Sequence, residues 1–412
     1  MDFAFSESSL ALQARLSAFF DHHVLPANPE WVRRASLGEY PIEIIEDLKP
    51  KARAEGLWNL FLPGLKEDEP GLRLSNLDYA PLAEIMGRLP WASEVFNCSA
   101  PDSGNIELLH LFASPDQSET WLKPLMRGEI RSCFAMSEPD VASSDASNIS
   151  TSIRREGDEL VINGRKWFIT GALHPHCKLC ILMGVSDPEA DPHQRHSMVL
   201  IPMDAPGVTI VRDISIMAHH TPEGHCEILF RNVRLPVSSL LGEQGRGFGL
   251  AQARLGPGRV HHCMRTIGQC ELALEMMCER ALSRTSFGQH LSQFSNVQDW
   301  IGQARVDIDQ ARLLVLRAAW MMDVLGNKAA HVEVSAIKLV AAQLQTRIAD
   351  RAIQVFGAMG LSPDTPLPWI WSWGRAMHFF DGPDEVHLRT LARQELNKAR
   401  KNLGKTAAYY TL

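Results

Sequence analysis

The chain has 412 residues, 45% of them hydrophobic, and its 41 Lys and Arg against 48 Asp and Glu give a net charge of −7. A chain of this length can bury a large core and exceeds one compact layer, so we expect two or three structural regions. The acidic balance excludes an overall positive field, which argues against nucleic acid as a partner. Eight scattered cysteines indicate reduced thiols and a cytoplasmic location.

We expect neither a secretory signal nor a membrane segment. The first ten residues, MDFAFSESSL, place Asp2 and Glu7 where a secretory signal has positive charge. The apolar run LLVLRAAWMM is interrupted by Arg317 and is too short to span a bilayer.

Residues 1–130 are predicted to form an N-terminal helical domain. The stretch SSLALQARLSAFFDHHVLP carries apolar residues near helical spacing, and Pro26 is predicted to end this helix. The residues that set the spacing are Leu10, Leu12, Leu16 and Phe19. A second helical pattern, PIEIIEDLKPKARAEGLWNLFLP, lies between prolines.

Residues 131–245 change to a β pattern. DELVINGRKWFITGA predicts a hairpin, with two apolar runs on either side of a turn at Asn163-Gly164. Four short strands follow in KLCILMGV, HSMVLIPM, GVTIVRDI and CEILFRNVRLP. This spacing predicts a middle domain that is an antiparallel β-barrel or sandwich.

Residues 246–412 return to helices, so the whole chain is predicted to be mainly α with one β domain. Apolar residues recur in steps of four and three from Val297 to Leu325, and again from Ile337 to Val355. A last helix is predicted near Pro383, with Asp384 and Glu385 in its first turn. These patterns indicate a C-terminal four-helix bundle.

Two motifs that could indicate cofactors or metals are weak. GEQGRGFG (242–249) follows no βαβ unit, so we interpret it as a loop. Cys177 and Cys180 form one CxxC without a second pair, and a strand there would point them to opposite faces, so no metal site is predicted. The histidines of AHHTPEGH (218–225) are interpreted as a solvated or substrate-rim loop.

Five other stretches stand in a recognisable order: CFAMSEPDVASSD (133–145), GRKWFITGA (164–172), RTSFG (284–288), QVFGAMG (354–360) and FFDGPDEVH (379–387). Together they resemble the acyl-CoA dehydrogenases over nearly the whole chain. The first two are similar to the flavin signatures of that family. The third and fourth are similar to stretches that meet the flavin across a dimer, and the fifth stands where the family keeps its catalytic carboxylate.

The sequence departs from the common pattern at three places. It has Asp381-Gly382-Pro383 where most members have Glu-Gly-Thr, and so resembles a branch that shares Asp-Gly-Pro-Asp-Glu-Val-His. The loop EPDVASSD is one residue longer than usual, which leaves Ser143 and Ser144 as alternatives at one position. Phe168 stands where Trp is usual.

The resemblance implies an FAD-dependent acyl-CoA dehydrogenase of fatty acid β-oxidation. Asp381 would remove an α-proton from the thioester while the β-carbon gives a hydride to flavin N5, and an electron-transfer flavoprotein would accept the electrons. The alternatives are an acyl-CoA oxidase that uses O₂, a flavin-binding relative associated with DNA, and a helical bundle that binds nothing. The same resemblance implies a homodimer or homotetramer.

Individual roles are also implied by the resemblance. Ser137 would face the pyrimidine side of the flavin and Thr170 its N5 edge, while Arg284 and Ser286 would hold the pyrophosphate. Ser144, or Ser143 as the alternative, would bind the CoA arm, with Arg259 and Gly382 as further substrate contacts. The remaining cofactor candidates are Phe134, Met136, Phe168, Phe294, Ser295, Gln354, Gly357, Pro383 and Glu385.

Asp381 also has a purely local interpretation. An aspartate before a helix is a preferred N-cap, and local sequence alone favours that role. As a base, Asp381 is expected to be desolvated by Phe379 and Phe380, which would raise its pKa toward the working pH.

Overall fold

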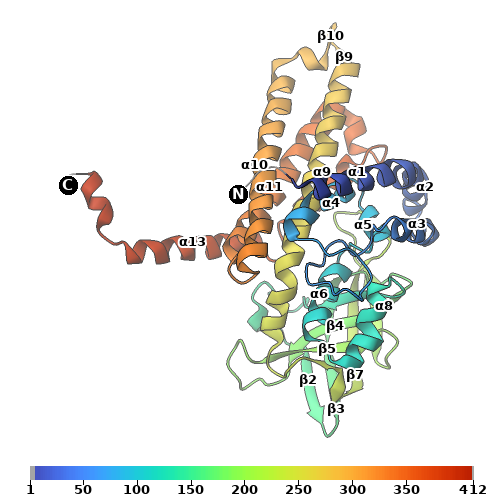
Figure 1. The fold of residues 1–412 in the computed structure, drawn as a ribbon, viewed down its shortest axis with the longest axis vertical. Helices are drawn as coiled ribbons and strands as arrows, with labels where there is room; N and C mark the ends of the chain where they lie inside the picture. The colour runs from blue at the N-terminus through green and yellow to red at the C-terminus, as the bar shows by residue number, and fades with distance from the viewer. Residues whose placement is uncertain (1–4, 411–412) are drawn as a thin grey trace. The chain divides into compact units, whose positions relative to one another are not determined.

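A computed structural model describes residues 5–410, and the chain divides into two compact units, Met1–Gly258 and Arg259–Leu412. The first unit holds an N-terminal set of helices and a middle β domain, and the second is helical, as predicted (Figure 1). No helix within residues 5–410 is both long and apolar enough to cross a bilayer.

The N-terminal helices of the first unit are short. They are α1 (Glu7–Phe19), η1 (Phe20–Val24), α2 (Leu25–Ala35), α3 (Ile42–Ala54), α4 (Asn76–Gly87), α5 (Ala92–Val95), α6 (Asp102–Phe112), α7 (Pro115–Gln117), η2 (Ser118–Leu122) and α8 (Lys123–Met126). The π-helical segments η1 and η2 connect α1 to α2 and α7 to α8. The apolar spacing in α1 is confirmed by the burial of Leu12, Leu16 and Phe19, whereas Leu10 is exposed.

Pro26 does not end the first helix, so that prediction is wrong. The π turn η1 continues from α1, and α2 begins at Leu25, which places Pro26 in the first turn of a helix. A proline there lacks only an N–H that would have no partner within its own helix. The chain therefore stays helical through Pro26.

The β domain is one eight-stranded sheet. Its strands are β1 (Arg131–Ala135), β2 (Ser152–Glu156), β3 (Glu159–Thr170), β4 (Cys177–Val185), β5 (His196–Pro202), β6 (Val208–Asp213), β7 (His225–Pro236) and β8 (Leu240–Leu241). The order is β6-β7-β3-β2-β4-β5-β8, and β1 pairs with β4. Most pairings are antiparallel, as predicted, but β1 runs parallel to β4.

The predicted hairpin at Asn163-Gly164 is wrong, because β3 runs straight through these residues. The register against β7 shifts between Ile162 and Gly164, so the glycine marks an irregularity in the strand and not a turn. A Cβ at Gly164 would lie 2.3 Å from Thr151 Oγ1, so no larger residue fits. β3 instead forms its hairpin with β2, through Gly157 and Asp158.

The prediction that Cys177 and Cys180 point to opposite faces is also wrong. Arg131 pairs with Cys177 and Ser132 with Leu179, so β4 contains an irregularity that breaks the two-residue alternation. Both cysteines consequently lie in the same buried cluster, together with Cys133. The described residues contain no group of three or more His, Cys, Asp or Glu that could hold a metal ion.

The second unit contains long helices. Its elements are the larger part of α9 (Gly247–Ser283), β9 (Thr285–Ser286), β10 (Gln289–His290), α10 (Ser295–Leu325), α11 (His331–Phe356), α12 (Leu367–Met377) and α13 (Asp384–Lys401). The predicted apolar seams are largely buried along α10 and α11, although Leu325 is exposed. The stretch predicted as a loop, 242–249, is a loop only over 242–246, because α9 already begins at Gly247.

Candidate active site

The two stretches predicted to face the flavin lie side by side in the first unit. Trp167 donates its backbone N–H to the carbonyl of Ser137 (3.0 Å), and Lys166 Nζ donates to the carbonyl of Met136 (2.8 Å). The end of β1 and the last residues of β3 are therefore tied together by hydrogen bonds. This arrangement brings Met136 and Ser137, just after β1, close to the stretch of β3 that carries Phe168 and Thr170.

A buried ion pair holds this junction in place. Lys166 Nζ lies 2.9 Å from Glu138 Oε1, and both side chains are almost fully buried. Glu138 also accepts hydrogen bonds from the backbone of Ser150 and Thr151. Burial raises the pKa of Glu138, but the Lys166 charge and these hydrogen bonds outweigh it and lower the value to about 2. Glu138 is consequently an ionised anchor for the loop after β1.

The residues at the end of β3 leave polar and aromatic groups available. Phe168 has a positive φ of 52° and a 45% exposed side chain, a conformation that non-glycine residues seldom adopt. Ser137 is half-buried, and no group among residues 5–410 hydrogen-bonds to its hydroxyl. Thr170 is half-buried, with its hydroxyl 2.9 Å from His225 Nδ1. The Phe168 ring, carried on a strained backbone, thus lies near the hydroxyls of Ser137 and Thr170.

Phe134 and the serine loop complete the group in the first unit. The Arg254 guanidinium lies 4.1 Å from the Phe134 ring centroid, and its Nε donates to Asn105 Oδ1 (2.7 Å). Ser143 Oγ accepts from the Glu138 backbone N–H (2.8 Å), whereas Ser144 is exposed. Ser143 thus closes its own loop, which favours Ser144 as the residue that could reach a ligand.

The second unit positions Asp381 in a short loop before α13. Its backbone has a φ of 53°, which Asp and Asn tolerate better than most residues. The carbonyl of Asp381 accepts from Arg259 Nε (2.7 Å), and one carboxylate oxygen lies 3.4 Å from His262 Nε2. The Asp381 side chain is 16% exposed, so it is largely but not fully shielded from water.

The loop is fixed further by Gly382 and His387. Gly382 has a φ of 102°, and a Cβ there would lie 3.0 Å from His387 Nε2. Burial lowers the pKa of His387 to about 4, so its ring is neutral at pH 7. A larger residue at position 382 would displace the ring, which explains why glycine follows the candidate base.

Three expectations about this loop need correction. Pro383, not Asp381, is the N-cap of α13, and it makes no side-chain cap bond, so the N-cap interpretation of Asp381 is wrong. Phe379 is 60% exposed and lies beside Arg375, so it does not shield Asp381. Phe380 contacts His262 and lies 5.2 Å from Lys338 Nζ, which makes the surroundings partly cationic rather than purely aromatic.

Arg259, predicted as a substrate contact, lies against the loop that carries Asp381. Its Nε is used by the Asp381 carbonyl, and burial lowers its pKa while the Asp381 charge raises it. Pro383 is half-buried and Glu385 is exposed in the first turn of α13. Arg259 therefore positions the loop that carries Asp381.

The pyrophosphate candidates lie at the other end of α9. Arg284 is exposed directly after α9 and makes no ion pair within the described part of the chain. Ser286 lies in β9, while Phe294 and Ser295 lie at the start of α10. Gln354 is exposed in the last turn of α11, and Gly357 follows this helix with a φ of 65°. Arg280 lies 5.3 Å from the Phe356 ring, so the ends of α9 and α11 are neighbours.

Within one copy of the second unit, the Asp381 loop and the pyrophosphate candidates after α9 lie far apart. Arg259 and Ser283 are separated by most of α9, which is roughly 36 Å at ~1.5 Å per residue. Asp381 lies at the Arg259 end and Arg284 lies just after Ser283. The two groups are therefore parts of different sites within one chain.

Sequence reasoning missed several titratable residues that organise these groups: Glu138, Lys166, His225, Arg254, His262 and Lys338. Lys338 is fully buried, and burial lowers its pKa. The signal available for Lys166 was a lysine inside an otherwise apolar strand pattern. A long-range partner such as Glu138 leaves no local periodicity to detect.

Models of three acyl-CoA dehydrogenase domains match this chain in succession. The N-terminal domain matches residues 6–129, the middle domain residues 133–233 and the C-terminal domain residues 245–396. The chain therefore belongs to the acyl-CoA dehydrogenase family, which is a family of flavin-dependent oxidoreductases. The resemblance found in the five sequence stretches is confirmed at the level of the family.

Individual relatives support the same assignment. The "Probable acyl-CoA dehydrogenase FadE2" of Mycobacterium tuberculosis is 51% identical over 97% of this chain and 98% of its own length. A solved structure from Mycobacterium abscessus that carries the acyl-CoA dehydrogenase name is 49% identical, with a TM-score of 0.93 over 96% of this chain and all of that one. Mouse acyl-CoA dehydrogenase family member 10 is 51% identical over 94% of this chain, which spans only 37% of the mouse protein.

Proposed function

We propose that this protein is an FAD-dependent acyl-CoA dehydrogenase that introduces an α,β double bond into an acyl-CoA thioester. The observation that carries the proposal is Asp381, a shielded carboxylate on a fixed loop in a member of this family. Its carboxylate is the only acidic side chain in the loop 379–383. The N-terminal part of α9, residues 247–262, includes RLGPGRVHH and contains no acid that could replace it.

The residues of the β domain fit a bound flavin. An isoalloxazine ring needs a flat apolar contact and hydrogen-bond donors at its polar edge. The end of β3 offers Phe168 and Thr170, and the stretch after β1 offers Ser137. FAD, when bound, would supply the hydride acceptor for the β-carbon. Phe134 and Met136 would line the same side of the sheet, and Ser144 would meet the CoA arm.

Asp381 would remove the α-proton. A general base of this kind contributes about 10²- to 10⁴-fold to a rate when its oxygen reaches the proton. Arg259 and Gly382 would hold the loop so that the carboxylate keeps its direction, while Phe380 would limit the access of water. The acyl-CoA class follows from the family.

A homo-oligomer completes the proposed site. Arg284, Ser286, Phe294, Ser295, Gln354 and Gly357 would contact the flavin of a neighbouring copy, because Arg284 and Ser286 follow the far end of α9, roughly 36 Å along that helix from Arg259 at the Asp381 loop. Two copies exchange these groups in an isologous dimer, which is the commonest symmetric assembly.

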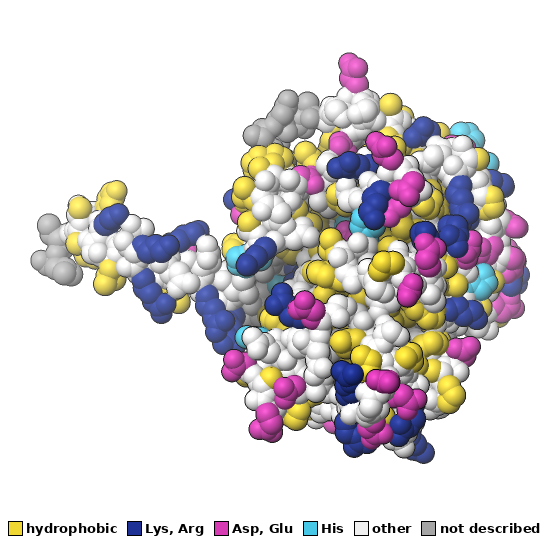
Figure 2. Space-filling model, turned by 60° about the horizontal axis from the view of Figure 1, so that its bottom comes forward, with side chains coloured by type: hydrophobic (Ala, Val, Ile, Leu, Met, Phe, Trp, Pro, Cys, Tyr) yellow, Lys and Arg dark blue, Asp and Glu magenta, His cyan; other side chains and the backbone are white. Residues whose placement is uncertain are grey.

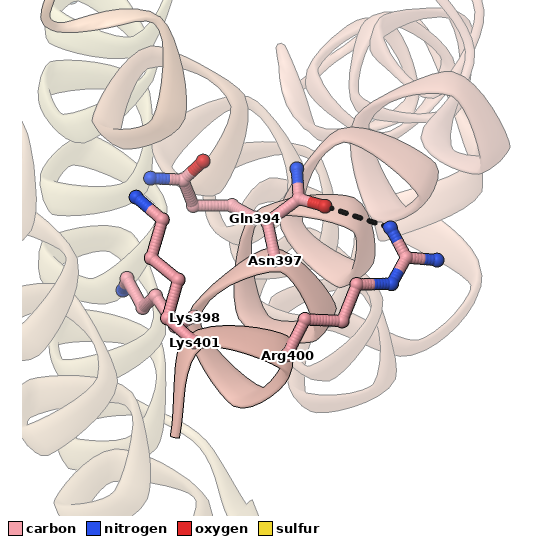
Figure 3. Close-up of a pocket in the computed structure, with 5 residues that line it drawn as sticks. All are labelled: Gln394, Asn397, Lys398, Arg400 and Lys401. Carbon is pink, nitrogen blue, oxygen red and sulfur yellow. Dashed lines mark hydrogen bonds between the residues drawn. The ribbon is translucent and has the colours of Figure 1, made fainter. Parts of the chain in front are cut away.

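The C-terminal arm, defined as residues 388–410, supports self-association. In Figure 1 it leaves the bundle and extends beyond α11, and Figure 2 shows basic and apolar side chains along it. Figure 3 shows Arg400 bonded to Asn397, while Lys398 and Lys401 extend from the same helix. Six Lys and Arg against one Glu give the arm a net charge of +5, so the rest of the chain carries −12. A second, acidic copy is thus a complementary partner.

Changing Leu396 and Leu403 together to Asp is expected to weaken self-association at least tenfold, because these leucines are 58% and 89% exposed in one copy. Light scattering after size exclusion measures the mass over a dilution series. Leu37→Asp with Leu111→Asp, at leucines 67% and 61% exposed elsewhere, is the matched control. An unchanged mass for the arm variant, with an oligomeric wild type, contradicts this role of the arm.

The proposed function is tested by the colour of the protein and by its bleaching. The purified chain is expected to be yellow, and an acyl-CoA panel under anaerobic conditions is expected to bleach the flavin band with at least one member. A protein that binds no flavin after reconstitution, or is bleached by no acyl-CoA, contradicts the proposal. Rapid recovery of colour in air would favour the oxidase, whereas recovery that needs an electron-transfer flavoprotein supports the dehydrogenase.

A further inference from the structure

We propose that His225 is a positioning residue that lets the Thr170 hydroxyl reverse the direction of its hydrogen bond. The inference deepens the proposed function and rests on it, because Thr170 is the residue expected to face flavin N5. The structural basis is a short chain of hydrogen bonds from Thr221 through His225 to Thr170.

The geometry of this chain is set by paired strands. Thr170, the last residue of β3, lies directly opposite His225, the first residue of β7. The Thr170 hydroxyl is 2.9 Å from Nδ1 of His225, and the Thr221 hydroxyl is 3.3 Å from Nε2. Asp213 Oδ1 accepts the backbone N–H of His225 (2.9 Å), and the carbonyl of Gly224 accepts from Gly171 N. These two hydrogen bonds fix the backbone at and before His225 and thereby hold its ring in place.

The ring between the two hydroxyls is neutral at pH 7. His225 is 3% exposed, and burial lowers its pKa to about 4, while the nearby Asp213 charge opposes this shift. A neutral imidazole has one N–H donor and one acceptor nitrogen. Other titratable groups of this loop include half-buried Glu223 and exposed His220, whose Nδ1 is 2.8 Å from Asp213 Oδ2.

The two tautomers give Thr170 opposite roles. With the proton on Nδ1, His225 donates to Thr170, whose own O–H can then be donated to an acceptor beyond the strand end. With the proton on Nε2, His225 donates to Thr221, and Thr170 donates to Nδ1 and can accept from a donor beyond the strand end. Flavin N5 accepts hydrogen bonds when the ring is oxidised and carries a hydrogen when the ring is reduced. A Thr170 hydroxyl that can either donate or accept therefore stabilises both redox states.

Removing the ring should disfavour the reduced state more than the oxidised one. In His225→Leu, a Thr170 oxygen that accepts a hydrogen bond has no partner for its own proton, and an unmet buried donor is costly. We expect the two-electron reduction equilibrium to fall about tenfold, which corresponds to a midpoint potential ~30 mV lower. His225→Asn, whose amide places a polar atom near Nδ1, is expected to restore most of the potential.

A double-mutant cycle separates positioning from general structural damage. The potential shift caused by His225→Leu should largely disappear in a Thr170→Ala background, because the effect acts through the hydroxyl. His220→Leu is the matched control, since His220 lies in the same loop and bonds Asp213 rather than Thr170. Nitrogen-15 NMR of the apoprotein should show His225 neutral at pH 6, with a tautomer balance that Thr221→Val changes.

The outcomes are distinct. If no flavin binds, the proposed function fails and this inference fails with it. If flavin binds and is bleached by acyl-CoA, either of two results shows that the inference alone is wrong. In one, His225→Leu keeps the wild-type potential. In the other, His225→Leu shifts the potential as much in the Thr170→Ala background as in the wild type. If His225→Leu does not fold, His225→Asn and Thr221→Val are compared instead, and an unchanged tautomer balance in Thr221→Val overturns the relay.

Discussion

Asp381→Asn is expected to lower the rate of flavin reduction by acyl-CoA by at least about 10²-fold, because the amide cannot accept the α-proton. The substitution is close to isosteric, and asparagine also tolerates the positive φ of 53° at this position. Flavin content and thermal stability should stay near the wild-type values. The rate is measured by anaerobic stopped flow with the acyl-CoA that bleaches the wild type fastest.

Two further variants sharpen this test. Asp364→Asn changes an exposed aspartate in the loop before α12 and is expected to leave the rate unchanged. Asp381→Glu keeps a carboxylate but puts a longer side chain on a strained backbone, so partial activity is expected. A flavin-loaded Asp381→Asn protein that is reduced as fast as the wild type would show that another group takes the proton.

Local signals in the sequence were sufficient for much of the architecture. The strands β4 to β7 were predicted because each is a short apolar run bounded by Pro, Gly or Asp. β4, β5 and β7 are largely buried in the sheet, whereas β6 is mostly exposed. The long seams of α10 and α11 repeat often enough to identify helices by period alone. The acids at the start of α13 are also where the dipole predicts them.

The failed predictions have one physical cause, which is that tertiary contacts decide how an ambiguous residue is used. Gly164 has the signature of a turn, but the nearby Thr151 side chain requires a glycine inside a strand. Pro26 ends a helix only if no new helical segment starts beside it. The irregularity in β4 that brings Cys177 and Cys180 together leaves no trace in the sequence pattern.

The candidate site was predictable only where family motifs mark it. Asp381, Ser137 and Thr170 were found from their motifs, whereas the residues that hold them come from distant parts of the chain. His262 and Arg259 on α9 reach the Asp381 loop, and His225 reaches Thr170 from β7. Such contacts depend on the fold, so a single sequence does not reveal them.

Lys166→Met is expected to destabilise the protein by about 3–5 kcal/mol, because it leaves the Glu138 carboxylate buried without its cation. The pair as a unit need not stabilise the fold. The low pKa of Glu138 shows that the pair stabilises the ionised carboxylate. Burial lowers the pKa of Lys166 to about 8, however, which reflects the cost of dehydrating the ammonium. The loss should therefore come from breaking the pair, and urea denaturation measures it.

The double variant Glu138→Gln with Lys166→Met separates charge from packing. Glutamine can still accept from the Ser150 and Thr151 backbones, and no buried charge is left, so part of the stability should return. Lys178→Met, at an exposed lysine of β4, is the matched control and should change stability by less than about 0.5 kcal/mol.

Flavin content connects this ion pair to function. Lys166 Nζ also donates to the carbonyls of Met136 and Met183, so its loss frees the end of β1 from β3. Lys166→Met should therefore bind FAD more weakly even where it remains folded, and the double variant should recover stability more fully than flavin affinity. If Lys166→Met is as stable as the wild type and retains its flavin, then Glu138 and Lys166 do not hold the junction on which the proposed flavin site depends.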